Sequence, residues 1–232
     1  MSKSFCVIPA RSGSKGLKDK NILDLNGMPV LAYSIKACEE SGLFEDVYVA
    51  TDSEEYAEIA KKYGGKVPFL EPKDMAGDFV SSLDPVLYFY EKLNVECDYI
   101  WCMQPTSPLR SKEDIINAYN ILEKNQKCQF VLSTTEIDPH YFHWALVDDE
   151  AGMSNLYFGK EMLVDRSELK DTVYRPNGAI KVGRCDAVLK QKNYFGNNIK
   201  RVEMPEERSI HIRNQMDLDM CEYIIKRRNT KL

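Results

Sequence analysis

The chain alternates short apolar runs of strand length with longer segments in which apolar residues recur at helical spacing. The clearest helical segment places Leu83, Val86, Leu87 and Tyr90 at i, i+3, i+4 and i+7, so that they share one face. This alternation is typical of a parallel sheet whose strands are joined by crossover helices, and it predicts an α/β fold. The expected strands are 5–10, 46–51, 67–70, 99–103, 128–134 and 179–182.

Capping signals mark where the expected helices begin and end. Gly42 provides a stop for the first helix, and Ser53 is a favoured N-cap for the second. Ser111 followed by Asp114 has the spacing of a capping box. A last helix is expected over 215–227. Its apolar face carries Met216, Met220, Tyr223 and Ile224.

Length and composition favour a single domain over the whole of 1–232. The 232 residues are 44% hydrophobic and include 12 Gly and 10 Pro, which is enough apolar material for one sizeable core. The regular alternation breaks at 135–174, where aromatic residues and turn signals are dense. We expect a small inserted lobe of short strands there. The lobe has more large apolar residues than a small solvent-exposed insertion usually carries, so it is expected to join two copies of the chain in a homodimer.

Charge and hydropathy limit the classes of partner. A formal net charge of -5 argues against nucleic acid or an anionic membrane surface as the main partner. No stretch approaches the roughly 20 apolar residues of a membrane helix, and the N-terminus lacks a signal-peptide pattern, so a cytoplasmic protein is expected. The seven cysteines are scattered, without metal-site spacing, and are expected to be buried, reduced thiols.

The loop after the first expected strand, residues 11–21, is dense in cations. It holds Arg11 and three lysines together with two glycines and small hydroxyl residues. Glycines let the backbone approach a ligand closely, and cations with hydroxyl donors suit a triphosphate. The pattern is neither a P-loop nor a GxGxxG turn, and a solvated basic loop is the alternative interpretation.

Two further polar clusters lie next to expected strands. In 104–110, two prolines fix the backbone while Gln104, Thr106 and Ser107 offer amide and hydroxyl groups to a ligand. In 174–180, Arg175 lies close to a glycine just before a strand and is suited to hold a carboxylate in a bidentate manner. An ordinary turn and a structural salt bridge are the respective alternatives.

Taken together, these clusters resemble the CMP-sialic acid synthetases, the acylneuraminate cytidylyltransferase family. The resemblance extends from the first expected strand to the last helix and implies a three-layer, Rossmann-like nucleotidyltransferase fold with a mainly parallel sheet. The motifs that carry it are Pro9-Ala10-Arg11 with Ser14-Lys15-Gly16 and Lys20-Asn21, Ser81-Ser82, 104–110 and 175–180.

The resemblance implies that the anomeric hydroxyl of a nonulosonic, sialic-acid-like sugar attacks the α-phosphate of CTP and that pyrophosphate leaves. The catalytic residues that hold the triphosphate are then Arg11, Lys15 and Lys20. The implied nucleotide-binding residues are Ala10, Arg11, Ser14, Asn21 and Ser82. The implied sugar-binding residues are Gln104, Thr106, Ser107, Arg166, Arg175, Lys181, Tyr194 and Phe195. Arg175 and Arg166 would grip the carboxylate, and the lobe would reach toward the neighbouring subunit's site.

Two departures from the family pattern concern the substrate pockets. Glu71 stands beside a proline where the family usually has an arginine, which removes one nucleobase contact. Lys181 replaces a tyrosine that often follows Asn-Gly-Ala-Ile, which indicates an altered sugar pocket.

A third departure concerns the metal. His211 and Arg213 stand where the family has two magnesium-binding aspartates, and neither is a good ligand for a hard cation. We therefore expect Mg²⁺ to enter mainly as the CTP complex. Asp217 and Asp219, one helical turn further on, are alternative ligands for a shifted ion.

Other functions are compatible with these residues. One is a related transferase acting on Kdo or another sugar. Another is a family member that binds a nucleotide or sugar without turnover, which the loss of the aspartates favours. The intact segments 11–21 and 104–110 favour an enzyme.

Overall fold

The chain folds around one central sheet. In a computed structural model, residues 2–14, 16–77, 80–160, 163, 165 and 171–229 are described. The sheet has six strands in the order β10-β6-β9-β5-β1-β4. Their bounds are β1 Ser4–Pro9, β4 Val47–Ala50, β5 Tyr99–Cys102, β6 Phe130–Ile137, β9 Val173–Arg184 and β10 Ile199–Glu203. β1 is parallel to β4 and β5, and β10 is parallel to β6, whereas β9 is antiparallel to both its neighbours. The predicted α/β fold with a mainly parallel sheet is confirmed.

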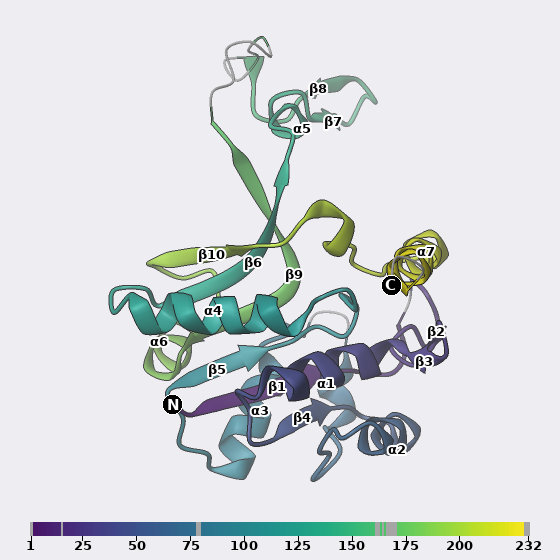
Figure 1. Ribbon diagram of the computed structural model, residues 1–232. Helices are drawn as coiled ribbons and strands as arrows, with labels where there is room; N and C mark the ends of the chain where they lie inside the picture. The colour runs from purple at the N-terminus through teal and green to yellow at the C-terminus, as the bar shows by residue number, and fades with distance from the viewer. Residues whose placement is uncertain are drawn as a thin grey trace.

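Helices cover both faces of the sheet, which gives three layers (Figure 1). On one face, α1 (Val30–Ser41), α2 (Glu54–Lys62) and α4 (Lys112–Lys124) pack against Cys6 and Ile8 of β1. On the other face, α3 (Asp84–Leu93) and α6 (Cys185–Gln191) pack against Phe5 and Val7. Alternate residues of β1 therefore face opposite layers, and all four are buried, as expected for a central strand.

The local signals for helix ends are confirmed. The α1 helix ends before Gly42. At the start of α2, the Ser53 side chain accepts a hydrogen bond from the backbone N–H of Tyr56. Ser111 and Asp114 form the predicted capping box of α4, and Arg208 forms an ion pair with Asp114.

Three strand predictions need correction. Residues 67–70 form no strand; the neighbouring Lys66 makes an isolated bridge to Tyr48. The strand expected at 179–182 is longer, begins at Val173 and runs antiparallel. The edge strand β10 was not expected, because four of its five residues are exposed and only Val202 supplies a buried apolar group. A polar edge strand carries little periodic signal.

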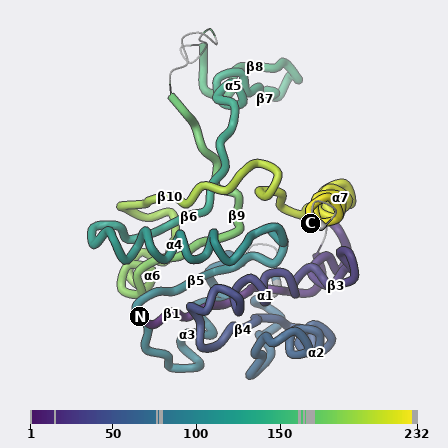
Figure 2. The backbone as a smooth tube through the Cα atoms, in the orientation of Figure 1, coloured from purple at the N-terminus to yellow at the C-terminus, as the bar shows by residue number. Residues whose placement is uncertain are grey.

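The inserted segment begins inside two strands. β6 and β9 continue past the sheet as a paired ribbon, in which Thr135 lies opposite Arg175 and Ile137 lies opposite Val173. At its end lie α5 (His140–His143) and the hairpin of β7 (Leu146–Asp148) and β8 (Ser154–Leu156). Figures 1 and 2 show this lobe standing away from the sheet. Several of its large side chains are exposed in the single chain, including Tyr141 at 75% and Tyr157 at 60%.

The last helix, α7 (Gln215–Asn229), packs beside the small hairpin of β2 (Asp24–Leu25) and β3 (Met28–Pro29). The described residues also include the 3₁₀ helices η1 (Lys73–Ala76) and η4 (Glu206–Arg208). The core face of α7 carries the buried Leu218 and Cys221 and the partly buried Ile224 and Ile225, whereas Met216, Met220 and Tyr223 are exposed. The apolar face expected from the sequence is therefore mostly solvent-facing in the single chain. Among the described residues, no helix is long and apolar enough to cross a membrane.

Candidate active site

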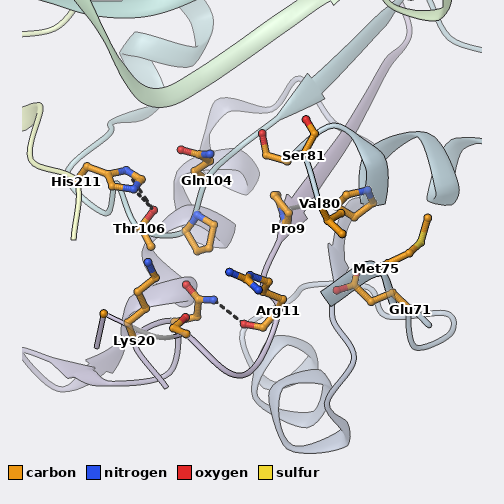
Figure 3. Close-up of a pocket in the computed structure, with 16 residues that line it drawn as sticks. Pro9, Arg11, Lys20, Glu71, Met75, Val80, Ser81, Gln104, Thr106 and His211 are labelled. Carbon is orange, nitrogen blue, oxygen red and sulfur yellow. Dashed lines mark hydrogen bonds between the residues drawn. The ribbon is translucent and has the colours of Figure 1, made fainter. Parts of the chain in front are cut away.

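A cavity of about 320 Å³ opens at the carboxyl ends of β1, β4 and β5 (Figure 3). We call it the strand-end cavity. Loops at this edge of an open α/β sheet are the usual place for a ligand. Its lining includes Arg11, Ser14, Gly16, Lys20, Asn21, Glu71, Met75, Val80, Ser81, Ser82, Gln104, Thr106 and His211. Most of the residues predicted to bind the nucleotide therefore meet in one place.

Hydrogen bonds from neighbouring elements anchor the basic loop. Ser12 donates from its backbone N–H and its hydroxyl to the two oxygens of Asp52, at 2.7 and 2.8 Å. Near the other end, the Tyr56 hydroxyl donates to Asp19 at 3.0 Å. The buried Asn21 amide donates to the carbonyl of Arg11 at 3.1 Å. The loop is thus held by contacts with Asp52 and Tyr56 and by one hydrogen bond within the loop itself.

Two cations of this loop face the strand-end cavity. Arg11 and Lys20 both line it, and Figure 3 shows them on its lower side. Burial, followed by the charge of Arg11, lowers the pKa of Lys20. Desolvation and like charge both disfavour the protonated ammonium, so a bound anion would relieve an unfavourable arrangement. This is the electrostatic character that a phosphate site requires.

Gly16 brings the basic loop against the segment before α7. An added Cβ at Gly16 would lie 2.7 Å from the carbonyl oxygen of Arg213. No side chain fits in that space, so only glycine allows the two backbones to come this close. The position of His211 and Arg213 is consequently coupled to the loop that carries Lys20.

The turn after β5 presents Gln104 and Thr106 to the strand-end cavity. The buried Arg110 supports this turn, because its guanidinium donates to the Gln104 carbonyl at 3.4 Å and to the Ser34 hydroxyl at 2.5 Å. Ser107 is 1% exposed and does not line this cavity. Its hydroxyl donates to the Asn177 carbonyl at 3.4 Å and lies 3.2 Å from Nδ1 of His211. Gln104 and Thr106 are available to a ligand, whereas Ser107 has a supporting role.

A second cavity of about 870 Å³ adjoins the first, and we call it the outer cavity. Gln104 and His211 line both. The outer cavity adds the exposed Arg175 and Gly178, whose backbone φ of +78° favours glycine. Arg175 therefore lies in the outer cavity rather than among the triphosphate-facing residues.

Lys181 lies beside the strand-end cavity. On β9 it is paired with Cys102 of β5, and its ammonium donates to the Ser82 hydroxyl at 2.9 Å. Ser82 itself lines the strand-end cavity. Lys181 thus fixes a residue predicted to contact the nucleotide, and it does not line either cavity.

The structure does not bring Tyr194 and Phe195 to either cavity, so their role in sugar binding stays a prediction. Tyr194 is 3% exposed and packs in the core cluster with α3 and α6. Phe195 is 53% exposed, but it lies beside Ile199 and Arg201 of the edge strand. Neither residue lines the strand-end or the outer cavity. The ring of Tyr194 instead fills part of the apolar layer between the sheet, α3 and α6.

Three other predicted residues need comment. Ala10 is fully buried at the end of β1, where its backbone N–H donates to Ala50 at 2.7 Å. It does not line the strand-end cavity, so its contribution is limited to shaping the loop. Lys15 and Arg166 lie outside the described residues.

Glu71 is a cavity residue that the sequence indicated only as a departure from a pattern. Its backbone N–H donates to the carbonyl of Thr51, just after β4, at 2.8 Å. The residue is 5% exposed, and its side-chain Oε2 has no hydrogen-bond partner within the described part of the chain. Burial, then Asp52, raises the pKa of Glu71 to about 7, and Arg11 opposes this shift.

The residues at the expected metal position do not fit magnesium. Burial, followed by the charges of Lys20 and Arg213, lowers the pKa of His211 to about 4, so its ring is neutral at pH 7. Both ring nitrogens lie 3.2 Å from the Thr106 hydroxyl. Arg213 is a cation, and its Nε lies 3.5 Å from Asp217. Neutral imidazole and guanidinium are poor ligands for a hard cation.

The acids of α7 have other partners. Asp217 accepts backbone N–H bonds from Arg213 at 2.8 Å and from Asn214 at 3.2 Å. Asp219 accepts from the Gln215 amide at 2.7 Å. Over the part of the chain that the structure describes, no group of three or more His, Cys, Asp or Glu side chains is arranged to hold a metal ion. The idea of a shifted ion at Asp217 and Asp219 gains no support.

Comparison with known proteins agrees with the site. Residues 5–198 match the family model described as cytidylyltransferase. The N-acylneuraminate cytidylyltransferase of Escherichia coli is 35% identical over 98% of this chain. This chain spans about half, 53%, of that relative's length. The pseudaminic acid cytidylyltransferase of Campylobacter jejuni strain 81-176 is 31% identical, with 97% of each protein covered.

Solved structures support the fold. A CMP:2-keto-3-deoxy-manno-octonic acid synthetase complexed with CTP superposes with a TM-score of 0.75 at 20% identity, covering 98% of this chain and 100% of that one. A 4-diphosphocytidyl-2C-methyl-D-erythritol synthase from Anaerococcus prevotii gives a TM-score of 0.66 at 14% identity, with 97% and 99% covered. The family match over most of the chain, the curated relatives and the cations at the strand ends agree, and the chain belongs to the cytidylyltransferase family.

Proposed function

We propose that this protein transfers CMP from CTP to a nonulosonic, sialic-acid-like sugar and releases pyrophosphate. The observation that carries the proposal is the placement of Arg11 and Lys20 in the strand-end cavity, next to an outer cavity that holds Arg175. One cavity offers cations for a triphosphate, and the other offers a guanidinium for a carboxylate. The names of the N-acylneuraminate and pseudaminic acid relatives support this choice of substrates.

The two cavities meet where the reaction would take place. The anomeric hydroxyl loses its proton to solvent, its oxygen bonds to the α-phosphorus, and the bond from that phosphorus to the bridging oxygen breaks. Negative charge moves onto the leaving pyrophosphate, which Arg11 and Lys20 stabilise. Gln104 lines both cavities, as does His211. The Gln104 amide can therefore contact the sugar where it meets the nucleotide and orient it for in-line attack.

The remaining assignments follow the lining of each cavity. Ser14, Asn21 and Ser82 fix the nucleotide, and Thr106 supports the sugar side together with Gln104. Arg175 holds the sugar carboxylate. The substrate is the magnesium complex of CTP, because His211 and Arg213 supply no carboxylate to a metal ion. We place the reaction in the cytoplasm, where CTP is available.

The test is pyrophosphate release from CTP and magnesium with a panel of acidic sugars. Sialic, legionaminic and pseudaminic acids are expected to be accepted as a class, ahead of Kdo. Release only with Kdo would favour the related eight-carbon transferase, whose fold this chain shares. CTP binding without turnover of any sugar would favour a non-catalytic member, which the replacement of both aspartates by His211 and Arg213 makes the second candidate.

We also propose a homodimer joined through the lobe at 135–174. Tyr141 and Trp144 are 75% and 52% exposed, and large aromatic groups on a projecting lobe are typical of a buried interface. The wild-type chain is expected to scatter light as a dimer at micromolar concentration, and Tyr141→Glu is expected to shift it toward monomer. The matched control is Tyr223→Glu on α7, an aromatic that is 59% exposed away from the lobe. A wild-type monomer, or an equal shift in both variants, would rule the lobe out.

A further inference from the structure

We infer that Glu71 selects the nucleobase, by accepting a hydrogen bond from the exocyclic amino group of cytosine. This rests on the proposed use of a nucleoside triphosphate in the strand-end cavity. It adds a specificity-determining residue at a position where the family pattern would have placed a cation.

The strand-end cavity has two chemically different ends. Figure 3 shows Lys20 and His211 at one end and Glu71, Met75 and Val80 at the other, with Arg11 between them. Phosphates belong with the cations. Figure 3 places the uncharged side chains of Met75 and Val80 beside Glu71 at that end. A flat base with apolar faces and a polar edge suits that end.

Glu71 offers that base an acceptor without a partner. Oε2 is buried and has no hydrogen-bond partner among the residues that the structure describes, and the residue as a whole is 5% exposed. A buried acceptor without a partner is unfavourable, so the arrangement persists where a ligand supplies the missing donor. The hydrogen bond from the backbone N–H of Glu71 to the Thr51 carbonyl holds the backbone of Glu71 next to the end of β4.

The chemistry of the two pyrimidines explains the expected choice. Cytosine carries an amino group at C4 and donates to a carboxylate oxygen there. Uracil carries a carbonyl oxygen at the same position, which an ionised carboxylate repels. Because burial and Asp52 raise the pKa of Glu71 to about 7, the carboxyl is ionised at pH 8.5. Discrimination against UTP is measured at that pH.

The experiment compares CTP, UTP, dCTP and GTP by calorimetry at pH 8.5 with magnesium present. The wild-type protein is expected to bind CTP about tenfold or more tightly than UTP, the scale of one buried hydrogen bond to a charged group. In Glu71→Gln, the amide can donate to uracil, so the preference is expected to fall to about threefold or less. Glu55→Gln, which removes an exposed carboxylate of α2, is expected to keep the wild-type preference.

Several results would overturn the inference. An unchanged CTP preference in both Glu71→Gln and Glu71→Ala, with folding checked by circular dichroism, would show that Glu71 does not read the base. If the Glu71 variants lost affinity for CTP and UTP by the same factor but kept their affinity for dCTP, Glu71 would instead contact a ribose hydroxyl. Preference of the wild type for GTP would assign the carboxylate to the donor edge of guanine. If the preference for CTP depends on Glu71 but no CMP is transferred to any sugar, this inference stands and the proposed function is overturned. If CMP is transferred but the preference for CTP does not depend on Glu71, the proposed function stands and this inference is overturned.

Discussion

Lys20→Ala is expected to lower kcat/KM for CTP by about 10 to 150-fold, which corresponds to about 1.5 to 3 kcal/mol for one charge-assisted contact. Lys20 lines the strand-end cavity, and burial, followed by the charge of Arg11, lowers its pKa. Its ammonium is partly desolvated before any ligand binds, so the interaction with a developing negative charge is strong. The measurement is initial-rate kinetics of pyrophosphate release with saturating sugar.

The control for this result lies in the same loop. Lys18 is exposed and does not line the strand-end cavity, so Lys18→Ala removes the same charge from the loop without removing a cavity contact. It is expected to keep kcat/KM within about twofold of the wild type. A Lys20→Ala enzyme that also stayed within about twofold would show that Lys20 has no part in holding the phosphates.

Magnesium titrated into the protein without nucleotide is expected to show no tight stoichiometric site. His211 is neutral and bonded to Thr106, and Arg213 repels any cation that approaches. The double variant His211→Asp with Arg213→Asp restores two carboxylates and is expected to bind magnesium about tenfold or more tightly, about 1.4 kcal/mol. Calorimetry with and without CTP gives both affinities. Tight stoichiometric binding to the wild-type protein alone would contradict the weak-site prediction.

The single variant Arg213→Asp addresses the role of the cation itself. Arg213 lines the outer cavity, where its guanidinium can share the electrostatic work of a metal ion. Loss of activity is expected, at fixed magnesium and CTP, because a favourable charge is replaced by a repulsive one. Arg227→Asp, an exposed position near the end of α7, is the charge-matched control. Equal activity of Arg213→Asp and the wild type would show that Arg213 takes no part in the chemistry.

Hydrophobic periodicity and local capping signals were sufficient to predict most strands and helices of the central sheet and its two helical layers. The buried runs at β1, β4 and β5 are short and apolar, and their helices carry caps such as Ser53 and Ser111 within a few residues of their first turns. Such signals depend on residues that are close together in the sequence, so they can be recognised from a single sequence. The place of the cationic loop after β1 at a ligand site was also predictable, because ligands of open α/β sheets bind at the carboxyl ends of the parallel strands. The antiparallel course of β9 had no local signal, because direction in a sheet depends on pairing with distant strands.

What the sequence determined by itself is therefore the α/β class and the loop that holds Arg11 and Lys20, whereas the loss of two aspartates at His211 and Arg213 is what the family resemblance implies. Only the tertiary structure decided that Tyr194 belongs to the core and that His211 is neutral. It also decided that Glu71 lines a cavity and that its Oε2 has no hydrogen-bond partner among the described residues. Burial and hydrogen-bond partners set these properties, and both come from residues far away in the chain. Thr106 bonds to His211 across 105 positions, and no pattern of adjacent residues carries that contact.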